Sequence, residues 1–290
     1  MRQLDTSMSE QERERLAQHY EREGYILLED ALSPEEVDEI RDEALSVCKG
    51  ERGEIQGWSP PQPSDSDDEV LKRYLAIHFP HKFSEVIHKS LFHPRIVDAL
   101  TTVIGPNVKA VQSMLFIKAS GKPGQAWHQD EYFIPTRDRS LAGVWIAIDD
   151  ATIDNGCLWV IPGSHRPAVI YAQREQHDDR FDVSGEAFGF PYDDDEAIPL
   201  EVRSGSVVVF NGYLLHRSLP NVTKGGYRRA LANHYMSAES LLPWRWPAQE
   251  TSIALLDCRD IVLVAGTDPY AYKGTEDVWR PMLRLDPTSK

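Results

Sequence analysis

The sequence has few cysteines, little positive charge and no long hydrophobic run. Its three cysteines, Cys48, Cys157 and Cys258, are widely separated and form no Cys-x-x-Cys pair. This pattern excludes a zinc ribbon and thioredoxin-type chemistry, and it favours reduced thiols in a cytoplasmic protein. With 31 Lys and Arg against 46 Asp and Glu, the formal net charge is −15. Such a charge argues against nucleic acid and anionic membranes as main partners.

Targeting and membrane signals are also missing. No apolar segment approaches the roughly 20 residues of a membrane span, and the N-terminus lacks the apolar run of a signal peptide. The final Pro-Thr-Ser-Lys is not a peroxisomal tripeptide, so we expect a cytoplasmic location. What the chain does contain is 41% hydrophobic residues over 290 positions, enough for a substantial core in one domain. We expect a monomer or a homodimer.

Residues 1–106 predict a helical flank that supports the rest of the chain. Ser9 can cap a helix over residues 9–23, which Gly24 ends, and Tyr-Ile-Leu-Leu-Glu follows as a short strand. Ser33-Pro34 opens a second helix to about residue 47, and residues 94–104 form another helical piece. Residues 49–68 are rich in Gly, Pro, Ser and Asp and predict a loop, either a plain surface loop or one near a site entrance.

Residues 107–237 predict the core of the protein. Short β-rich segments alternate with turn signals there, which indicates a mainly β fold with flanking helices and a jelly-roll core. A long polar insertion at about residues 171–201 is expected to be a lid. Residues 238–290, which include Trp244, Trp246 and Trp279, are expected to form a flap over the core or against a second subunit.

Two potential metal ligands stand two residues apart in Trp-His-Gln-Asp-Glu-Tyr-Phe, at residues 127–133. If this piece is extended, His128 and Asp130 point to the same face, because a strand repeats every two residues. An imidazole and a carboxylate on one face supply two of the three ligands of an iron-binding facial triad. A His-x-Asp triplet also arises by chance, so this interpretation needs a third ligand.

His216 is the candidate third ligand. It follows the apolar strand Ser-Val-Val-Val-Phe-Asn, and after a loop the chain returns as Tyr-Arg-Arg-Ala-Leu-Ala-Asn-His-Tyr. In an antiparallel return, the start of the second strand lies beside the end of the first. Arg228 or Arg229 is therefore expected close to His216.

An arginine at this place suits a 2-oxo acid cosubstrate. Two imidazoles and one carboxylate leave about three open positions on Fe(II). A 2-oxo acid would take two of them and dioxygen the third, while a buried arginine would bind the distal carboxylate in a bidentate pair. Arg228 shares its strand face with two alanines that leave room for a cosubstrate, and Arg229 shares the other face with Leu231. Arg228 is therefore the better candidate.

Four other histidines have competing explanations. His78 and His81 have ligand-like spacing, but a structural or surface role explains them as well. His165, in Pro-Gly-Ser-His-Arg, is expected to hold a turn through hydrogen bonds. His234 shares the face of Arg228 and is either a group that supports the ligands or a core histidine.

With these residues in view, the chain resembles the phytanoyl-CoA dioxygenase family of Fe(II)- and 2-oxoglutarate-dependent oxygenases. The matching motifs are His-Gln-Asp-x-x-Tyr-Phe at residues 128–133, Trp-Ile-Ala-Ile-Asp-Asp, Asn-Gly-Cys-Leu-Trp-Val-Ile-Pro-Gly-Ser-His, and His-Arg-Ser-x-x-Asn-Val-Thr-Lys-Gly-Gly-Tyr-Arg at residues 216–228. Together they cover roughly residues 108–237.

The resemblance implies a double-stranded β-helix core, the cupin-like form of the jelly roll. It implies a catalytic Fe(II) on His128, Asp130 and His216. It also implies 2-oxoglutarate held by Arg228, with three further residues contributing to its binding: Ser218, Lys118 and Trp145. Asp130 favours oxygenation, because related halogenases have a small residue at the carboxylate position.

The implied reaction uses O2 and converts 2-oxoglutarate to succinate and CO2 while an unactivated C–H bond of a small organic substrate is hydroxylated. The family's substrates range from acyl-CoA thioesters to natural-product intermediates, and this chain has no evident Lys and Arg cluster for the phosphates of coenzyme A. We expect substrate selectivity from residues 57–61 and 171–201 and from three residues beside the triad: Gln129, Tyr132 and Phe133.

Two other classes of function remain open. One is a non-catalytic jelly-roll protein that binds a metal or ligand. The other is a cupin-type metal enzyme that uses zinc or manganese without 2-oxoglutarate.

Overall fold

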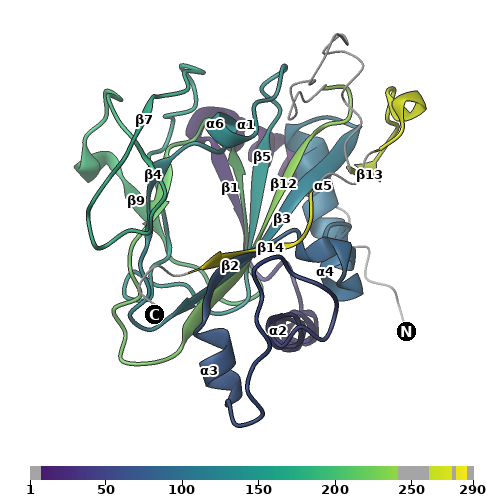
Figure 1. The fold of residues 1–290 in the computed structure, drawn as a ribbon. Coiled ribbons are helices and arrows are strands. Elements are labelled where there is room, and N and C mark those ends of the chain that lie inside the picture. Colours follow the sequence, from purple (N-terminus) through teal and green to yellow (C-terminus); the bar gives the residue numbers. More distant parts are fainter. Residues whose placement is uncertain (1–7, 241–260, 276–278, 286–290) are drawn as a thin grey trace, which may run out of the picture.

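The computed structural model describes residues 8–240, 261–275 and 279–285 (Figure 1). Its α-helices are α1 (Glu10–Glu23), α2 (Pro34–Cys48), α3 (Asp67–Leu71), α4 (Glu85–Ser90), α5 (Pro94–Val103) and α6 (Asp130–Phe133). Its strands are β1 (Tyr25–Leu28), β2 (Tyr74–His78), β3 (Val108–Ala119), β4 (Gln125–His128), β5 (Ala142–Ala147), β6 (Leu158–Val160), β7 (Gln173–Arg174), β8 (Glu186–Ala187), β9 (Ile198–Leu200), β10 (Val207–Asn211), β11 (His216–Ser218), β12 (Tyr227–Ser237), β13 (Val262–Ala265) and β14 (Met282–Leu285).

The first two helices begin and end at the residues that the sequence indicates. The Ser9 side chain accepts a hydrogen bond from the Glu12 amide, and Gly24, at φ 85°, ends α1 in the left-handed conformation that glycine adopts most easily. Ser33 and Glu36 form a capping box at the start of α2, with Pro34 in the first turn. These local signals confirm the predicted helical boundaries to within a residue or two.

Two antiparallel sheets form the core. The larger has the order β1-β10-β5-β12-β3-β2-β14, with β13 also paired to β3, and the smaller has the order β4-β11-β6-β9. In Figure 1 β4, β9 and β7 lie to the left of the larger sheet, α5 lies to its right, and α4 and α2 lie at its lower right and below it. This arrangement confirms the expected jelly roll with flanking helices.

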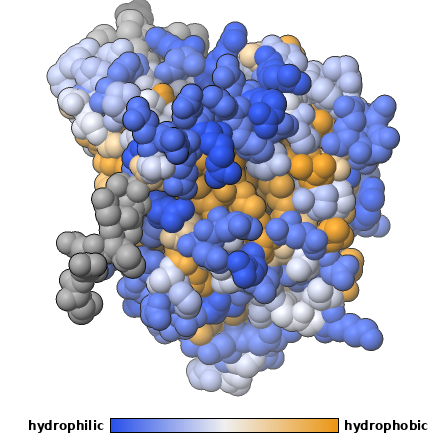
Figure 2. All heavy atoms as spheres, turned by 180° about the vertical axis from the view of Figure 1, so that it is seen from behind, coloured by the Kyte–Doolittle hydropathy of each residue, from blue (hydrophilic) through white to orange (hydrophobic). Residues whose placement is uncertain are grey.

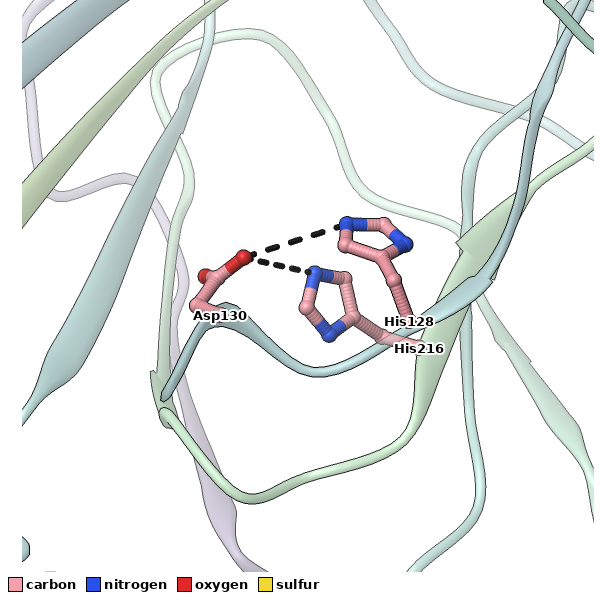
Figure 3. A group of neighbouring side chains, drawn as sticks. All are labelled: His128, Asp130 and His216. Carbon is pink, nitrogen blue, oxygen red and sulfur yellow. Dashed lines mark ion pairs between the residues drawn. The ribbon is translucent and has the colours of Figure 1, made fainter. Parts of the chain in front are cut away.

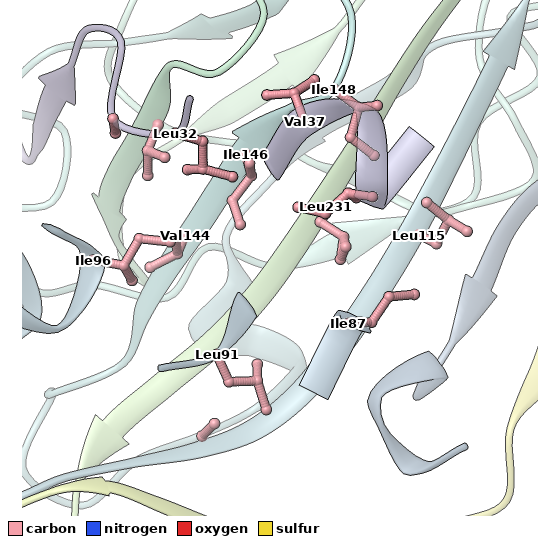
Figure 4. Close-up of a cluster of buried hydrophobic side chains, with 14 of the residues drawn as sticks. Leu32, Val37, Ile87, Leu91, Ile96, Leu115, Val144, Ile146, Ile148 and Leu231 are labelled. Atoms are coloured by element: carbon pink, nitrogen blue, oxygen red, sulfur yellow. The ribbon is translucent and has the colours of Figure 1, made fainter. Parts of the chain in front are cut away.

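Alternation along the strands separates the two faces of the larger sheet. Val144, Ile146 and Leu231 point into a hydrophobic layer shared with the helices (Figure 4). Val207 and Val209 belong to the same hydrophobic cluster. Their sequence neighbours point the other way, into a second cluster between the sheets that includes Trp145, Val208, Phe210, Ala230 and Ala232. Because side chains alternate along a strand, the even-numbered residues around Ala230 and Ala232 of β12 lie on the side of this inner cluster.

The flanks contribute more to the sheet than the sequence suggests. The expected helical flank supplies β1 and also β2, which no sequence pattern had marked, and the tail supplies β13 and β14 as strands of the larger sheet. Trp279 stacks on Phe79 with ring centroids 5.9 Å apart, while Trp244 and Trp246 lie outside the described residues. The described tail therefore extends the sheet.

The polar insertion is ordered around a small hairpin. β7 and β8 pair in it, and Asp193 caps a short 3-10 turn at Asp194–Glu196 before β9 joins the smaller sheet. The surface opposite to Figure 1 is largely hydrophilic around a central apolar region (Figure 2). None of the described helices has the length and hydrophobicity needed to cross a membrane.

Candidate metal centre and cosubstrate cavity

The two candidate histidine ligands face each other on neighbouring strands of the smaller sheet. His128 ends β4, His216 begins β11, and the two are direct partners in the antiparallel register. Directly opposed side chains share one face of a sheet. The chain stays extended at Gln129 (φ −128°, ψ 131°) and then turns into α6 at Asp130. One extended residue is enough to bring Asp130 back to the face of His128, although the strand itself does not continue.

The three candidate ligands converge (Figure 3). Asp130 Oδ1 lies 3.8 Å from His128 Nε2 and 3.6 Å from His216 Nε2. All three residues are buried, and their ligand atoms lie within 4.8 Å of one another. Two atoms that each bind one ion at about 2.1 Å can be no more than roughly 4.2 Å apart, so both carboxylate–imidazole distances fit a shared metal ion.

Hydrogen bonds orient each of these side chains. His128 Nδ1 lies 2.8 Å from the Ala126 carbonyl oxygen, and His216 Nδ1 lies 2.9 Å from the Leu214 carbonyl oxygen. A carbonyl can only accept, so each Nδ1 carries the proton and each Nε2 keeps its lone pair for a metal. On β12, His234 places its Nε2 2.9 Å from Asp130 Oδ2, which leaves Oδ1 toward the two histidines.

Burial sets the protonation of the group. It lowers the pKa of His128 to about 3, with the neighbouring His216 adding to the effect. Burial alone would raise the pKa of Asp130, but the surrounding imidazoles, His234 foremost, outweigh it and hold that pKa below its usual value. The lowered pKa values of His128 and Asp130 favour a neutral imidazole beside an ionised carboxylate, as a divalent metal requires.

Arg228 lies on the wall of the same cavity, which has a volume of about 360 Å³. Its side chain is 3% exposed, its Nε donates to the Gly156 carbonyl oxygen at 3.1 Å, and its guanidinium lies 5.5 Å from the Trp145 ring centroid. No ion pair within the described part of the chain includes Arg228. Burial lowers its pKa to about 10, so it remains a cation at neutral pH. Arg229 is instead committed to Asp149 through two 2.8 Å hydrogen bonds on the opposite face.

Lys118 and Ser218 form a polar pair beside Arg228. Lys118 Nζ donates to Ser218 Oγ at 2.9 Å and to the Leu219 carbonyl at 2.6 Å, with Gly156 O at 3.4 Å. Burial lowers the pKa of Lys118 well below its usual value. Ser218 Oγ accepts from Lys118 and from the Gln125 amide, so its own proton is available to a ligand. Lys118 is therefore occupied by protein oxygens, while Ser218 keeps a donor.

Of the three residues expected to select the substrate, two lie apart from the cavity wall. Gln129 is fully buried: its amide donates to the Val169 and Tyr213 carbonyls, and its oxygen accepts from the Tyr171 amide. Its side chain is thus committed to the backbone. Tyr132 is 45% exposed and packs on Phe133, which lines the cavity with its ring 6.4 Å from that of His128.

The remaining sequence candidates are distributed around this centre. His78 lines the cavity without joining the metal cluster, and His81 is buried against Ser113. His165 Nε2 donates to the Glu21 carbonyl oxygen, near the end of α1, at 3.1 Å. The insertion contributes Asp182 to the cavity, whereas residues 57–61 do not line it.

Sequence reasoning did not single out several cavity residues, and two polar ones among them matter for the site. Gln112 lies on β3 and Arg284 on β14. The alternation in Met-Leu-Arg-Leu was the available signal for β14.

Comparison with known proteins assigns the chain to a family. The model of the family described as Phytanoyl-CoA dioxygenase (PhyH) matches residues 20–230. This chain belongs to the phytanoyl-CoA dioxygenase family. A curated family relative, Phytanoyl-CoA dioxygenase 1 of Oryza sativa subsp. japonica, is 30% identical over 250 residues, covering 76% of this chain and 87% of the relative. Membership confirms the enzyme class and cofactors expected from the sequence: a non-haem iron oxygenase that uses 2-oxoglutarate.

Solved structures share the fold of this phytanoyl-CoA dioxygenase family member. The non-heme monooxygenase ThoJ in its apo form superposes with a TM-score of 0.66 at 21% identity, covering 94% of this chain and 88% of its own. CytC3 with Fe(II) and alpha-ketoglutarate gives a TM-score of 0.59 at 22% identity, covering 94% and 95%. At these identities the likeness concerns the fold, which agrees with the expected double-stranded β-helix.

Proposed function

We propose that this protein hydroxylates an unactivated C–H bond of a small organic substrate, with Fe(II) held by His128, Asp130 and His216. The observation that carries the proposal is the convergence of three metal-ligand atoms in a cavity whose wall presents the buried cation Arg228. The structurally similar CytC3 is described with Fe(II) and alpha-ketoglutarate, which supports the same pair of cofactors here.

His128 and His216 would bind iron through Nε2, because their Nδ1 protons are held by backbone carbonyls. Asp130 would bind through Oδ1 while His234 holds Oδ2. When bound, iron and 2-oxoglutarate supply the oxidising chemistry, with succinate and CO2 as coproducts. The carboxylate at position 130 completes the three-residue ligand set and supports oxygenation as the outcome.

Arg228 would bind the distal carboxylate of 2-oxoglutarate. Its Nε donates to the Gly156 carbonyl and its guanidinium lies over Trp145, so its other nitrogens would be available to a ligand in the cavity that Arg228 lines. A buried arginine paired with a carboxylate makes strong, directional hydrogen bonds. Ser218 supplies a further hydroxyl donor, and Lys118 acts through Ser218, which it holds in place.

Apolar side chains on the cavity wall would limit the access of water to the reaction. Met114, Phe116 and Leu158 line the cavity together with Phe133 at its more exposed side. A dry cavity protects the oxidising step from side reactions with solvent. The substrate is a small molecule on this proposal; a monomeric or homodimeric state and a cytoplasmic location remain predictions.

Succinate formation from 2-oxoglutarate under air with Fe(II) tests the proposal. We expect the wild type to form succinate, His128→Ala to lose both iron binding and succinate formation, and Arg228→Ala to keep iron binding. In Arg228→Ala the KM for 2-oxoglutarate should rise by about 100-fold, since a charged hydrogen-bonded contact contributes about 3 kcal/mol.

Arg229→Ala is the matched control, because it removes a neighbouring arginine from the other face of β12. It should change the KM for 2-oxoglutarate by less than about twofold. Absence of succinate from the wild type, with every candidate substrate tried, would contradict the oxygenase and favour a binding protein. Activity with zinc or manganese but without 2-oxoglutarate would favour the cupin-type alternative.

A further inference from the structure

The cavity carries one cation that the metal centre and the cosubstrate leave without a role. Among its lining residues the acidic ones are Asp130 and Asp182, and the basic ones are Lys118, Arg217, Arg228 and Arg284. Lys118 is occupied by Ser218 and backbone carbonyls, and Arg217 pairs with Asp194 at 2.9 Å while its guanidinium stacks on Trp127. With Arg228 assigned to 2-oxoglutarate, Arg284 is the remaining basic group.

The register of β14 turns Arg284 toward the cavity. Arg284 pairs with Ala76 of β2, and Ala76 pairs in turn with Phe116 of β3. Directly paired residues share a sheet face, and Ala76 belongs to the cluster between the sheets. The neighbouring Leu283 packs against the outer cluster. Strand alternation therefore places the Arg284 side chain on the same interior face as Arg228.

Asp182 fixes Arg284 in this position. Arg284 Nη2 lies 2.7 Å from both Asp182 oxygens, and the Asp182 side chain is only 8% exposed. Asp182 Oδ1 also accepts from the Ser184 amide at 2.9 Å and from the Ser184 hydroxyl. The Asp182 backbone is tied by a 2.9 Å hydrogen bond to Gly124, in the segment that leads into β4.

The Asp182 carboxylate thus accepts hydrogen bonds from several donors, whereas some N–H groups of Arg284 have no acceptor among the described residues. Within the described residues, neither Nε nor Nη1 of Arg284 has a hydrogen-bond partner. A guanidinium offers five N–H groups in a planar fork, so an arginine held by a carboxylate on one edge can still bind an anion on another. Asp182 therefore holds the Arg284 guanidinium in place and leaves part of it available to an anionic ligand.

The substrate region next to Arg284 contains neutral polar groups and apolar surface. His78 is the register partner of Met282 on β14, and its Nδ1 lies 3.5 Å from Gln112 Nε2. Burial lowers the pKa of His78 to about 4, with Arg284 contributing, so this imidazole is neutral at pH 7. Leu75, Met114 and Phe133 supply apolar wall. A ligand here meets one available cation, neutral donors and hydrophobic side chains.

We propose that Arg284 is the specificity-determining residue of this oxygenase and that it binds a carboxylate of an organic acid substrate, with Asp182 as its positioning partner. The inference rests on the proposed function, since it assigns the substrate class of the same cavity. It places the anionic group of the substrate at β14 and leaves its hydrocarbon part along the apolar wall toward the metal centre.

Binding of three matched probes tests this assignment without requiring turnover. Hexanoate, hexanamide and hexylamine are titrated calorimetrically under nitrogen into the Fe(II) protein saturated with 2-oxoglutarate. We expect hexanoate to bind at least about tenfold more tightly than the other two, the ratio that about 1.4 kcal/mol of selective interaction produces. Equal affinities, a preference for hexylamine, or no binding of hexanoate would overturn the proposal.

Variants assign the preference to Arg284. Arg284→Gln should reduce it to about twofold or less, and Arg284→Lys should retain part of it. The double variant Asp182→Asn/Arg284→Gln removes the buried carboxylate that the single variant leaves unpaired, so it guards against a folding defect. A hexanoate preference that survives in both variants would refute the role of Arg284. Arg203→Gln, which breaks an exposed pair with Asp30, is the control and should keep the full preference.

The same measurements separate this inference from the proposed function. The probes are bound in the absence of oxygen, so a hexanoate preference lost in Arg284→Gln would stand even if no succinate were formed under air. Conversely, succinate formation that depends on Arg228, without any carboxylate preference, would support the oxygenase and reject Arg284 as its selector.

Discussion

At the scale of single residues, His234 shows how one imidazole can determine the geometry of another residue. It donates toward Asp130 Oδ2 at 2.9 Å and leaves Oδ1 to face His128 and His216. The sequence placed His234 on the face of Arg228 by alternation, but it left open whether the residue supports the ligands or fills the core. The turn of the chain into α6 at Asp130 brings that carboxylate beside His234, and the sequence alone does not reveal this contact.

Loss of His234 should weaken metal binding without unfolding the protein. We expect His234→Ala to reduce the affinity for Fe(II) or Co(II) by about tenfold or more, because groups that orient metal ligands contribute that much. Anaerobic calorimetry measures the affinity, and circular dichroism checks the fold. His165→Ala, which removes a histidine that contacts the Glu21 carbonyl, is the control. Equal metal affinities in His234→Ala and wild type would contradict the positioning role.

His81 is a buried histidine that should make the protein sensitive to acid. Its Nδ1 lies 2.6 Å from Ser113 Oγ, and burial, with Lys82 adding to it, lowers its pKa to about 4. An unfolded histidine has a pKa of about 6.5. The unfolded chain therefore binds a proton at a higher pH than the folded protein, so the stabilisation is complete above about pH 6.5 and is lost as the pH falls toward 4.

Replacing His81 by Gln should make the pH dependence shallower. Between pH 6.5 and 4.5 the wild type should lose about 2 kcal/mol more of its free energy of unfolding than His81→Gln, which has no group to protonate there. Urea unfolding at pH 7, 5.5 and 4.5 measures the difference. Parallel curves for the two proteins would show that His81 is protonated equally in both states.

At the scale of elements, the turn before β6 is as important to the cosubstrate cavity as the strands. Gly156 adopts φ 83°, and a Cβ atom there would lie 2.2 Å from the Leu219 carbonyl oxygen. Its own carbonyl accepts from Arg228 at 3.1 Å and from Lys118 at 3.4 Å. Gly156 therefore allows two chain segments to meet, and its carbonyl orients the side chains of Arg228 and Lys118.

Gly156→Ala should damage stability and 2-oxoglutarate binding together. The left-handed backbone costs an alanine about 1 kcal/mol or more and the contact with Leu219 adds to that, so we expect about 2 kcal/mol or more of destabilisation. The KM for 2-oxoglutarate should rise several-fold, roughly in line with a disturbed Arg228. Gly225→Ala, where a Cβ would meet nothing within 4 Å, is the control. Unchanged binding in Gly156→Ala would show that the Gly156 carbonyl is dispensable.

The elements also show which parts of the site the sequence could predict. Capping residues marked α1 and α2, and alternation on β12 put Arg228 opposite to Arg229, as the two faces of the larger sheet require. Gln129 lies between two candidate ligands in the sequence, but its side chain is hydrogen-bonded to backbone groups, which a local pattern does not reveal; its role in substrate selection stays a prediction. β2 is hydrophobic on both faces, so its sequence shows no alternation of polar and apolar residues. The pairing of β14 with β2 joins segments more than 200 residues apart in the chain. Such pairing depends on the complete fold, which no local pattern encodes.

At the scale of the whole molecule, a metal ion would link strands that are distant in sequence. His128 and His216 are 88 positions apart in the chain but directly paired in the smaller sheet. An ion that binds the folded site and not the unfolded chain stabilises the fold by about 2.7 kcal/mol at 100 times its dissociation constant. For a chain of this size, that corresponds to a rise of about 5 °C in melting temperature.

Metal removal tests this coupling. Melting of the wild type under nitrogen should occur about 5 °C lower with EDTA than with excess Fe(II) or Ni(II). His128→Ala should melt at the same temperature under both conditions. A shift of the same size in the variant would place the stabilising ion elsewhere.

The position of β14 has a consequence for biosynthesis. His128, Asp130, His216 and Arg228 all precede residue 230, whereas Arg284 follows more than 50 residues later. A ribosome therefore finishes the parts that hold iron and 2-oxoglutarate well before it adds the strand that closes the edge beside β2. The wall on which Arg284 lies is therefore synthesised after the residues proposed to hold iron and 2-oxoglutarate. The residue proposed to select the substrate is thus translated after the residues proposed to bind the metal and the cosubstrate.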